Sequence, residues 1–283
     1  MSAAHDRPTA VRVTHVSKTY SDGERPVTAL ADVGLDIGRG EFVSIIGPSG
    51  CGKSTLLRMA AGLERPDRGA VEVFGLGPAE AGEAKLLGLV PQRPALLPWL
   101  DVGSNIALPL RLNPAAARRR AELSTVPKSG DLDVTELLRA AGLAGTEKLL
   151  PHELSGGMQQ RVAVVRAFAL QPAVLLMDEP FSALDEFTRE SLQGQLLSIW
   201  AEFSTTVIFV THSVTEAVRL SDSVVVMAPG RIIDRIDIDL DHPRNGEQLQ
   251  SARFHHYEDL LRSRLQSAWR ESARGTEAPE APR

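Results

Sequence analysis

The chain has 283 residues, of which 43% are apolar and 24% are charged, and its formal net charge is −5. This balance excludes a disordered chain and gives no general reason to expect nucleic-acid binding, which usually needs a basic face. We interpret the basic run Arg118–Arg120 as a solvated helix face.

Cys51 is the single cysteine, which excludes an internal disulfide and fits a reducing compartment. No segment approaches the roughly 20 apolar residues that a membrane-spanning helix needs. The polar start, residues 1–9, lacks the apolar core of a signal peptide. We therefore expect a cytoplasmic protein whose membrane role, if it has one, depends on a partner.

Short apolar segments before residue 91 predict strands. They are 11–16, 30–37, 42–46, 70–74 and about 86–90. The run 42–46 is nearly continuous, as expected for a strand covered on both faces. A helix over 53–61 follows, and Gly62 supplies the left-handed residue that commonly ends a helix.

Helical periodicity runs from about 104 to 145, with breaks at Asn113-Pro114 and at the polar segment 124–133. Beyond it, helices alternate with strands, which predicts a largely parallel sheet wrapped by helices. The expected helices are 155–170, 185–203 and 213–220, and the strands between them are 174–177 and 206–210. Strands 223–227 and 231–238 meet at Pro229-Gly230 and predict a hairpin.

The end of the chain, from residue 241, becomes polar. Apolar residues at helical spacing predict a helix that lies on the body, followed by a disordered tail over 271–283. The inward-facing residues of this helix are expected to be Phe254, Tyr257, Leu260, Leu261, Leu265 and Trp269.

One glycine-rich loop, Gly47–Ser54, matches the phosphate-loop pattern G-x-x-x-x-G-K-[ST] between a strand and a helix. Glycines let backbone N–H groups surround phosphate oxygens, and the helix N-terminus adds a partial positive charge. Lys53 can reach the β- and γ-phosphates, and Ser54 can ligate Mg²⁺. We predict that ATP is bound by Gly47, Pro48, Ser49, Gly50, Cys51, Gly52, Lys53, Ser54 and Thr55.

Two carboxylates, Asp178 and Glu179, end the strand 174–177, at the edge where open α/β sheets bind ligands. Successive residues of a strand point to opposite faces, so the two acids should differ in role. Asp178 is expected to hold Mg²⁺, and Glu179 to orient and deprotonate the attacking water. The alternative is an exposed acidic loop.

A second glycine segment begins the helix 155–170, within Leu154-Ser-Gly-Gly-Met-Gln-Gln-Arg161. Ser155 alone is explained as an N-cap, worth about 1 kcal/mol. The paired Gly156 and Gly157 are not, and they indicate a second anion site. Two phosphate-binding helix ends for one nucleotide suggest a dimer that encloses ATP.

Together these motifs resemble the nucleotide-binding subunit of the ATP-binding cassette (ABC) family over about residues 11–240. The resemblance includes Gln92, the segment 182–185 and His212. It implies an α/β P-loop NTPase core with a mostly parallel sheet, an N-terminal antiparallel β part and a helical subdomain at about 93–165. Residues 241–283 would form the C-terminal helix and tail.

The resemblance also implies roles for single residues. Tyr20 would stack on adenine, although a tyrosine there could equally pack on the surface. Gln92 would contact Mg²⁺ and the lytic water and sense a membrane subunit, or it is simply a loop residue. His212 would hold the γ-phosphate and the water. Asp185 would lie at the dimer seam.

In a closed dimer, Ser155 and Gly157 would contact the γ-phosphate of ATP held by the partner, with Gly156 and Gln159 beside them. The expected catalytic residues are Lys53, Gln92, Glu179 and His212. The expected Mg²⁺ ligands are Ser54, Gln92 and Asp178. Since Cys51 lies in the phosphate loop, we expect ATP to shield its thiol from reagents.

A chain with one cassette and no spanning segment resembles importer ATPases, whose permeases are separate chains. The sequence Leu96-Leu-Pro-Trp99, together with Asp178–Asp185, is similar to importers of nitrate, alkanesulfonates and taurine. Leu96, Leu97 and Trp99 either belong to the core or line a groove for a permease helix. The segment 113–133 is longer and more irregular than the helical region that the family usually has at this place, and the tail could regulate or simply pack.

We therefore expect a peripheral ATPase on the cytoplasmic face of the membrane, with a homodimer at its ATP sites. Its partners would be permease subunits and, indirectly, a solute-binding protein, with no nucleic acid. The alternatives are an importer ATPase for another small solute and a soluble cassette ATPase that acts on ribosomes or DNA. A small-molecule kinase would leave 154–160 and His212 unexplained.

Overall fold

The structure is a computed structural model. It describes residues 7–22, 25–123, 134–182, 184–203, 205–244 and 246–276. The part of the predicted irregular segment at 124–133 therefore lies outside the described residues. In the described ranges, no helix combines the length and the apolar composition that a membrane span requires.

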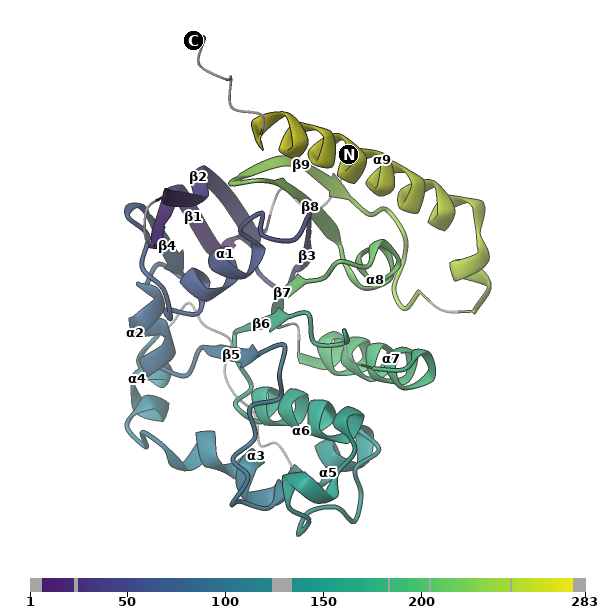
Figure 1. The fold of residues 1–283 in the computed structure, drawn as a ribbon. Helices are drawn as coiled ribbons and strands as arrows, with labels where there is room; N and C mark the ends of the chain where they lie inside the picture. Colours follow the sequence, from purple (N-terminus) through teal and green to yellow (C-terminus); the bar gives the residue numbers. More distant parts are fainter. Residues whose placement is uncertain are drawn as a thin grey trace, which may run out of the picture.

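In the part of the chain that the structure describes, the strands form two sheets (Figure 1). The smaller sheet has the order β2-β1-β4, with β1 antiparallel to both neighbours. Its strands are β1 (Thr9–Asp22), β2 (Arg25–Gly38) and β4 (Arg68–Val73). This confirms the predicted antiparallel part, although β1 and β2 are both longer than the alternating segments that predicted them.

The larger sheet has the order β5-β6-β7-β3-β8-β9, in which every neighbouring pair from β5 to β8 is parallel. The last pair, β8 and β9, is the predicted antiparallel hairpin. The strands are β5 (Leu87–Val90), β6 (Val174–Asp178), β7 (Thr206–Val210), β3 (Phe42–Ile46), β8 (Ser223–Ala228) and β9 (Arg231–Asp237). The predicted mostly parallel sheet is confirmed. Because β6, β7 and β3 are neighbours, the residues that follow them meet at one edge.

Helices surround these sheets. They are α1 (Lys53–Ala60), α2 (Pro78–Glu83), α3 (Val102–Arg111), α4 (Ala116–Glu122), α5 (Val134–Ala140), α6 (Gly156–Ala169), α7 (Glu186–Phe203), α8 (Val214–Leu220) and α9 (Ala252–Thr276). Two short 3₁₀ segments, Pro151–Glu153 and Gly246–Gln250, precede α6 and α9. The short helix α2 was not predicted. Figure 1 shows α3, α5 and α6 on the side of the large sheet away from the small sheet.

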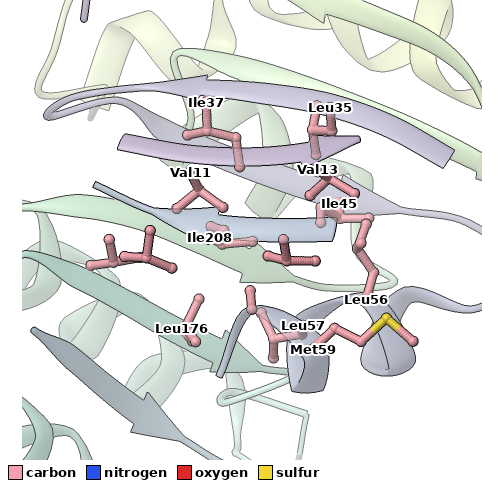
Figure 2. Packing of buried hydrophobic residues seen from close by; sticks show 14 of the residues in the cluster. Val11, Val13, Leu35, Ile37, Ile45, Leu56, Leu57, Met59, Leu176 and Ile208 are labelled. Carbon is pink, nitrogen blue, oxygen red and sulfur yellow. The ribbon is translucent and has the colours of Figure 1, made fainter. Parts of the chain in front are cut away.

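Helix α1 lies between the two sheets and carries the phosphate loop at its start. Leu56, Leu57 and Met59 are buried in one cluster with side chains of both sheets (Figure 2). Fully burying a side chain of this size is worth about 1.5–3 kcal/mol. At the other end, Gly62 has φ +73° and donates to the Met59 carbonyl at 3.0 Å, as expected for a helix that ends in a left-handed residue. The core therefore anchors the helix whose first turn faces the site.

The C-terminal helix packs on the body as predicted, but two details of the prediction are wrong. Trp269 is 62% exposed, whereas its neighbour Ala268 is fully buried. The helix also continues through Glu271 to Thr276, in the segment expected to be disordered. Phe254 and Leu261 bury α9 in a cluster with α8 and β8.

The basic run on α4 also differs from its prediction as a solvated face. Arg120 is 9% exposed, and its guanidinium donates to the carbonyls of Leu170 at 3.2 Å and Gln171 at 2.7 Å. These carbonyls end α6, so Arg120 satisfies acceptors that the helix leaves unpaired. Arg119 remains at the surface, where it pairs with Glu80 and Glu83.

Candidate active site

The phosphate loop leaves β3 after Ile46 and enters α1 at Lys53. Two of its glycines are required by close approach of other strands. A Cβ at Gly47 would lie 2.6 Å from the Met227 carbonyl, and one at Gly52, where φ is +107°, would lie 2.4 Å from the Ala29 carbonyl. Cys51, Gly52 and Pro48 are buried, Thr55 is half-buried, and Ser49, Gly50 and Ser54 are exposed.

The side chain of Lys53 is folded into the curl of this loop. It is 7% exposed, and its Nζ donates to the carbonyls of Gly47 and Pro48, both at 2.9 Å. A cation is therefore held at the loop beside the N-terminus of α1, which carries a partial positive charge. This arrangement fits the polyphosphate chain of a nucleotide.

Ser54 and Asp178 meet across the site. The Ser54 hydroxyl donates to Oδ1 of Asp178 at 2.9 Å, although the two residues are far apart in the sequence. Burial raises the pKa of Asp178, and the hydrogen bond from Ser54 partly opposes that rise. A hydroxyl and a carboxylate are the hard oxygen ligands that Mg²⁺ prefers, so these residues fit the predicted ion.

Glu179 begins the loop after β6 in an unusual backbone conformation. Its φ is +45°, a region that non-glycine residues seldom adopt and that tends to occur at functional sites. The Glu179 N–H donates to the carbonyl of Val210 at the end of β7. Ser182 in turn donates its hydroxyl to the Glu179 carbonyl at 3.0 Å. The backbone of Glu179 is thus held by hydrogen bonds at both its N–H and its carbonyl.

Two further predicted residues reach the Glu179 carboxylate. Gln92 donates its amide N–H to Oε2 at 3.1 Å, and His212 Nδ1 lies 3.6 Å from the same oxygen. These residues follow β5 and β7, the two neighbours of β6. The parallel sheet therefore gathers Gln92, Asp178, Glu179 and His212 at one edge, where Ser54 joins them. Such a set can bind a nucleotide, orient a water and accept its proton.

The predicted adenine contact, Tyr20, lies on β1 opposite Val27. The Lys18 Nζ lies 5.5 Å from the centroid of its ring. Strand β2 continues from Val27 to Ala29, the residue against which Gly52 packs. This places Tyr20 on the strand pair that borders the phosphate loop, while its contact with adenine stays a prediction.

The second glycine segment lies at the start of α6. Ser155 caps this helix by accepting the Met158 N–H at 3.3 Å. A Cβ at Gly156 would meet nothing within 4 Å, whereas one at Gly157 would lie 3.2 Å from Thr188 of α7. Within the described ranges, no hydrogen bond joins Ser155 or either glycine to the phosphate loop of the same chain. Gly156 thus presents open backbone at a helix N-terminus.

Gln159 supports this segment from within the protomer. Its amide nitrogen donates to the carbonyls of Pro151 at 2.9 Å and Leu154 at 3.3 Å. The donor group of Gln159 is thus engaged in bracing the turn that presents Ser155. Asp185 has a similar local role, since its Oδ1 accepts the Thr188 N–H at 3.0 Å. That hydrogen bond is the main reason that the pKa of Asp185 is lowered.

The motifs did not reveal two residues that hold the loop after Gln92. Arg166 of α6 donates to the carbonyls of Pro94 at 2.8 Å and Ala95 at 2.9 Å. Asn105 of α3 is fully buried. Its Oδ1 accepts the Leu97 N–H at 2.8 Å, and its Nδ2 donates to the Leu97 carbonyl at 3.1 Å. Arg166 and Asn105 lie on helices whose sequences have no motif at these positions, so the sequence did not predict their role.

The loop that these residues hold presents Trp99 to solvent, with 71% of the residue exposed. Leu96 packs on the cluster formed with α3 and α6, and Leu97 is half-buried. The alternative that these three residues belong to the core is therefore wrong for Trp99, whereas Leu96 is partly buried against the core.

The family model described as ABC transporter matches residues 30–182. This chain belongs to the ABC transporter family. The matched residues include the phosphate loop, the signature segment of α6 and both carboxylates, Asp178 and Glu179. The chain is an ABC transporter ATPase.

Curated relatives of this ABC transporter ATPase match over most of both chains. An aliphatic sulfonates import ATP-binding protein, SsuB 1 of Xanthomonas axonopodis pv. citri, is 44% identical over 82% of this chain and 88% of its own. SsuB of Bacillus subtilis is 42% identical over 83% of this chain and 88% of its own. An uncharacterized ABC transporter ATP-binding protein of Methanocaldococcus jannaschii is 42% identical over 85% of this chain and 86% of its own.

Two solved structures that match this chain are described as dimeric. A post-hydrolysis state of an ATP-binding cassette, bound to ADP and Pi, is 33% identical and superposes with a TM-score of 0.69. It covers 82% of this ABC transporter ATPase and 100% of the solved chain. A second dimeric structure, of a bacterial ABC transporter cassette, is 32% identical with the same TM-score. The P-loop α/β fold predicted from the sequence is confirmed.

Proposed function

We propose that this ABC transporter ATPase energises an importer, and that two copies enclose two ATP molecules between them. The observation that carries this proposal is the convergence of Gln92, Asp178, Glu179 and His212 on the edge that also holds the phosphate loop. In this set Glu179 is the base, His212 is the residue for the γ-phosphate, and Gln92 begins the loop that reaches toward a partner. A merely nucleotide-binding protein needs none of these three.

Each residue then has a defined task. Lys53 and the loop N–H groups bind the phosphates, and Glu179 orients the water and accepts its proton. Mg²⁺, held by Ser54 and Asp178 with Gln92, neutralises phosphate charge when bound. Gln92 and His212 both lie near the Glu179 oxygen, so they are placed to orient the water and to hold the γ-phosphate. Catalysis on this scheme depends on positioning and charge stabilisation.

The homodimer is supported by the open backbone at the start of α6. Gly156 faces free space, and Ser155 and Gly157 flank it. In the dimer this helix N-terminus binds the γ-phosphate of the partner's ATP. Asp185 accepts the Thr188 N–H, and a Cβ at Gly157 would lie 3.2 Å from the Thr188 side chain, so Asp185 belongs to the same seam. The two related solved cassettes are dimers, in keeping with this proposal.

The permease partner is supported by Trp99. A tryptophan that is 71% exposed on a loop held by buried Asn105 and by Arg166 is a typical anchor for a protein partner. This loop follows Gln92 directly, so contact at Trp99 can change the position of Gln92 at the ATP site. The enzyme would then work as a peripheral subunit on the cytoplasmic face of the membrane.

The solute class is supported by identity to relatives. Proteins named aliphatic sulfonates import ATP-binding protein are 42–44% identical to this chain over more than four-fifths of its length. We therefore propose an aliphatic sulfonate rather than nitrate as the imported solute. The solute itself is selected by the binding protein and permease, and the ATPase supplies only energy.

The test is reconstitution. The chain would be purified from membranes with the permease that accompanies it, and both would be placed in liposomes with the cognate solute-binding protein. ATP-dependent uptake of ethanesulfonate is expected, with taurine and nitrate as competing solutes. Uptake of a different solute would correct the solute class alone. Purification with ribosomes or DNA and without a permease would overturn the assignment to import.

A further inference from the structure

Glu216 is a buried carboxylate that sits behind the ATP site. It lies in the first turn of α8 and is 8% exposed. Its two oxygens face two different elements, one the segment that carries His212 and the other helix α7. Burial raises its pKa, which means that the charged form is held there at a cost.

The first oxygen, Oε2, is directed to the segment that carries His212. The Thr211 hydroxyl donates to Oε2 at 2.5 Å and accepts the Ser213 N–H at 3.0 Å. In an ordinary capping box, a glutamate at this position accepts the N-cap N–H directly. Here the threonine hydroxyl is inserted between the two groups. The backbone is therefore held on both sides of His212.

The second oxygen, Oε1, is directed to the start of α7. The Gln193 amide donates to it at 3.2 Å, and Arg189 Nε lies 3.7 Å away. The same arginine donates through Nη2 to the Leu184 carbonyl at 2.7 Å. Its backbone N–H donates to the Asp185 carbonyl at 3.0 Å. Glu216 thus reaches the Leu184–Asp185 segment through Arg189.

That segment also lies close to Gly157 at the start of α6. A Cβ at Gly157 would lie 3.4 Å from Leu184 and 3.2 Å from Thr188. Leu184–Asp185 therefore adjoins the surface that faces the partner's ATP in the proposed dimer. A shift of this segment on dimer closure would move Arg189 relative to Glu216, and Thr211 would move with it.

We propose that Glu216 is a positioning residue that couples His212 to the Leu184–Asp185 segment. This inference rests on the proposed role of His212 in hydrolysis. Glu216 touches neither ATP nor the water. Its carboxylate orders the backbone around His212 when Leu184–Asp185 is in place, so that hydrolysis follows closure of the seam.

Thr211 offers the sharpest test because two substitutions separate its hydroxyl from its shape. Thr211→Val keeps the branched shape and removes the hydroxyl, whereas Thr211→Ser keeps the hydroxyl. In the full chain, Thr211→Val is expected to lower the kcat of ATP hydrolysis about tenfold, the effect of losing one hydrogen bond to a charged group. ATP affinity and KM should change less than about twofold, since Lys53 and the loop are untouched. Thr211→Ser should restore most of the rate.

Thr215, on α8 next to Glu216, provides a matched control. Its hydroxyl donates to Glu258 of α9 over the same distance, 2.5 Å. Thr215→Val therefore removes an equivalent bond between a threonine and a glutamate that does not face His212. We expect its kcat to stay within about twofold of the wild-type value. A loss of rate in both valine variants would indicate a general effect on α8 and would overturn the proposal.

Two more variants complete the test. Glu216→Gln should lower kcat as Thr211→Val does, and the double variant should be no slower than the slower single variant, because both break one chain of contacts. If Thr211→Val does not fold, Glu216→Gln with Thr215→Val as control decides the matter in the same way. A wild-type kcat in Glu216→Gln would overturn the proposal. His212→Ala separates the two ideas, since a normal rate in that variant refutes the role of His212 itself.

Discussion

Gln92 donates its amide N–H to Oε2 of Glu179, with 3.1 Å between nitrogen and oxygen. The two residues belong to different loops, one after β5 and one after β6. His212, after β7, approaches the same oxygen to 3.6 Å. The proposed base thus lies on one loop and is approached by side chains from two others. The loop of Gln92 continues to the exposed Trp99. Movement of that loop changes the surroundings of the base.

The first prediction concerns Glu179. Glu179→Gln keeps the size of the side chain and one oxygen that can accept the Gln92 N–H, but removes the group that accepts the proton. ATP hydrolysis should fall about 100-fold or more, whereas ATP binding stays near the wild-type value. Phosphate release and nucleotide binding measure the two effects, and size-exclusion chromatography should show an ATP-dependent dimer. Glu186→Gln, on the exposed first turn of α7, serves as the control. A normal rate in Glu179→Gln would refute Glu179 as the base.

Much of this site could be predicted because its motifs are local. The phosphate loop and Asp178-Glu179 each lie at the end of an apolar strand, and parallel strands place their carboxyl ends together. The contact of Ser54 with Asp178 at 2.9 Å follows from that rule. Gln92 and His212 needed the family resemblance, because a single glutamine or histidine in a loop carries no local signal.

What could not be predicted depends on partners distant in the sequence. Arg120 was expected in solvent, yet it is buried because the end of α6 offers it the carbonyls of Leu170 and Gln171. Trp269 was expected to face inward because it falls at helical spacing with other apolar residues, yet it is exposed and its neighbour Ala268 is buried. Arg166 and Asn105 bond loop carbonyls whose positions are set by tertiary packing. Side-chain type alone did not decide any of these placements.

A second prediction compares two glycines of the phosphate loop. Gly52 has φ +107°, and a Cβ there would lie 2.4 Å from the Ala29 carbonyl. Gly52→Ala should therefore lower the free energy of unfolding by roughly 3 kcal/mol or more and weaken ATP binding. Gly50 has φ +77° but open space around its Cβ, so Gly50→Ala should cost only about 1–2 kcal/mol. Denaturant unfolding measures both values, and equal losses would contradict the role of the Ala29 contact.

A third prediction concerns Cys51, for which the structure changes the expectation. The residue is 1% exposed, and burial raises the pKa of its thiol. Only the thiolate reacts readily, so less of the reactive form is present at pH 8 than in an ordinary cysteine. Labelling of the folded protein should be slow both with and without ATP, and fast in denaturant. Rapid labelling of the folded chain that ATP suppresses would instead favour a thiol on the nucleotide side of the loop.

A fourth prediction uses the pH dependence of stability at Glu216. Burial raises the pKa of this carboxyl in the folded protein, so the folded state binds its proton more tightly than the unfolded state does. The group therefore favours folding at low pH, and this contribution is lost as the pH rises through the raised pKa. Glu216→Gln does not titrate. The Tm of the variant minus that of the wild type should be more positive at pH 7.5 than at pH 4.5, measured by calorimetry. An unchanged difference would show that the carboxyl has its ordinary pKa.

The last prediction concerns the exposed tryptophan of the loop after Gln92. The Trp99 side chain is 71% exposed, so Trp99→Ala should leave basal ATP hydrolysis within about twofold of the wild-type rate. A buried interface tryptophan contributes about 2 kcal/mol or more to binding, so the affinity for the permease should fall by a factor of about 30 or more. Trp269 on α9 is 62% exposed and serves as the matched control, since Trp269→Ala removes the same side chain from another surface. Co-purification with the permease and transport-coupled hydrolysis measure the effect. Equal losses in both variants would show that Trp99 is no specific contact, because a general loss of exposed aromatic surface would then explain the result.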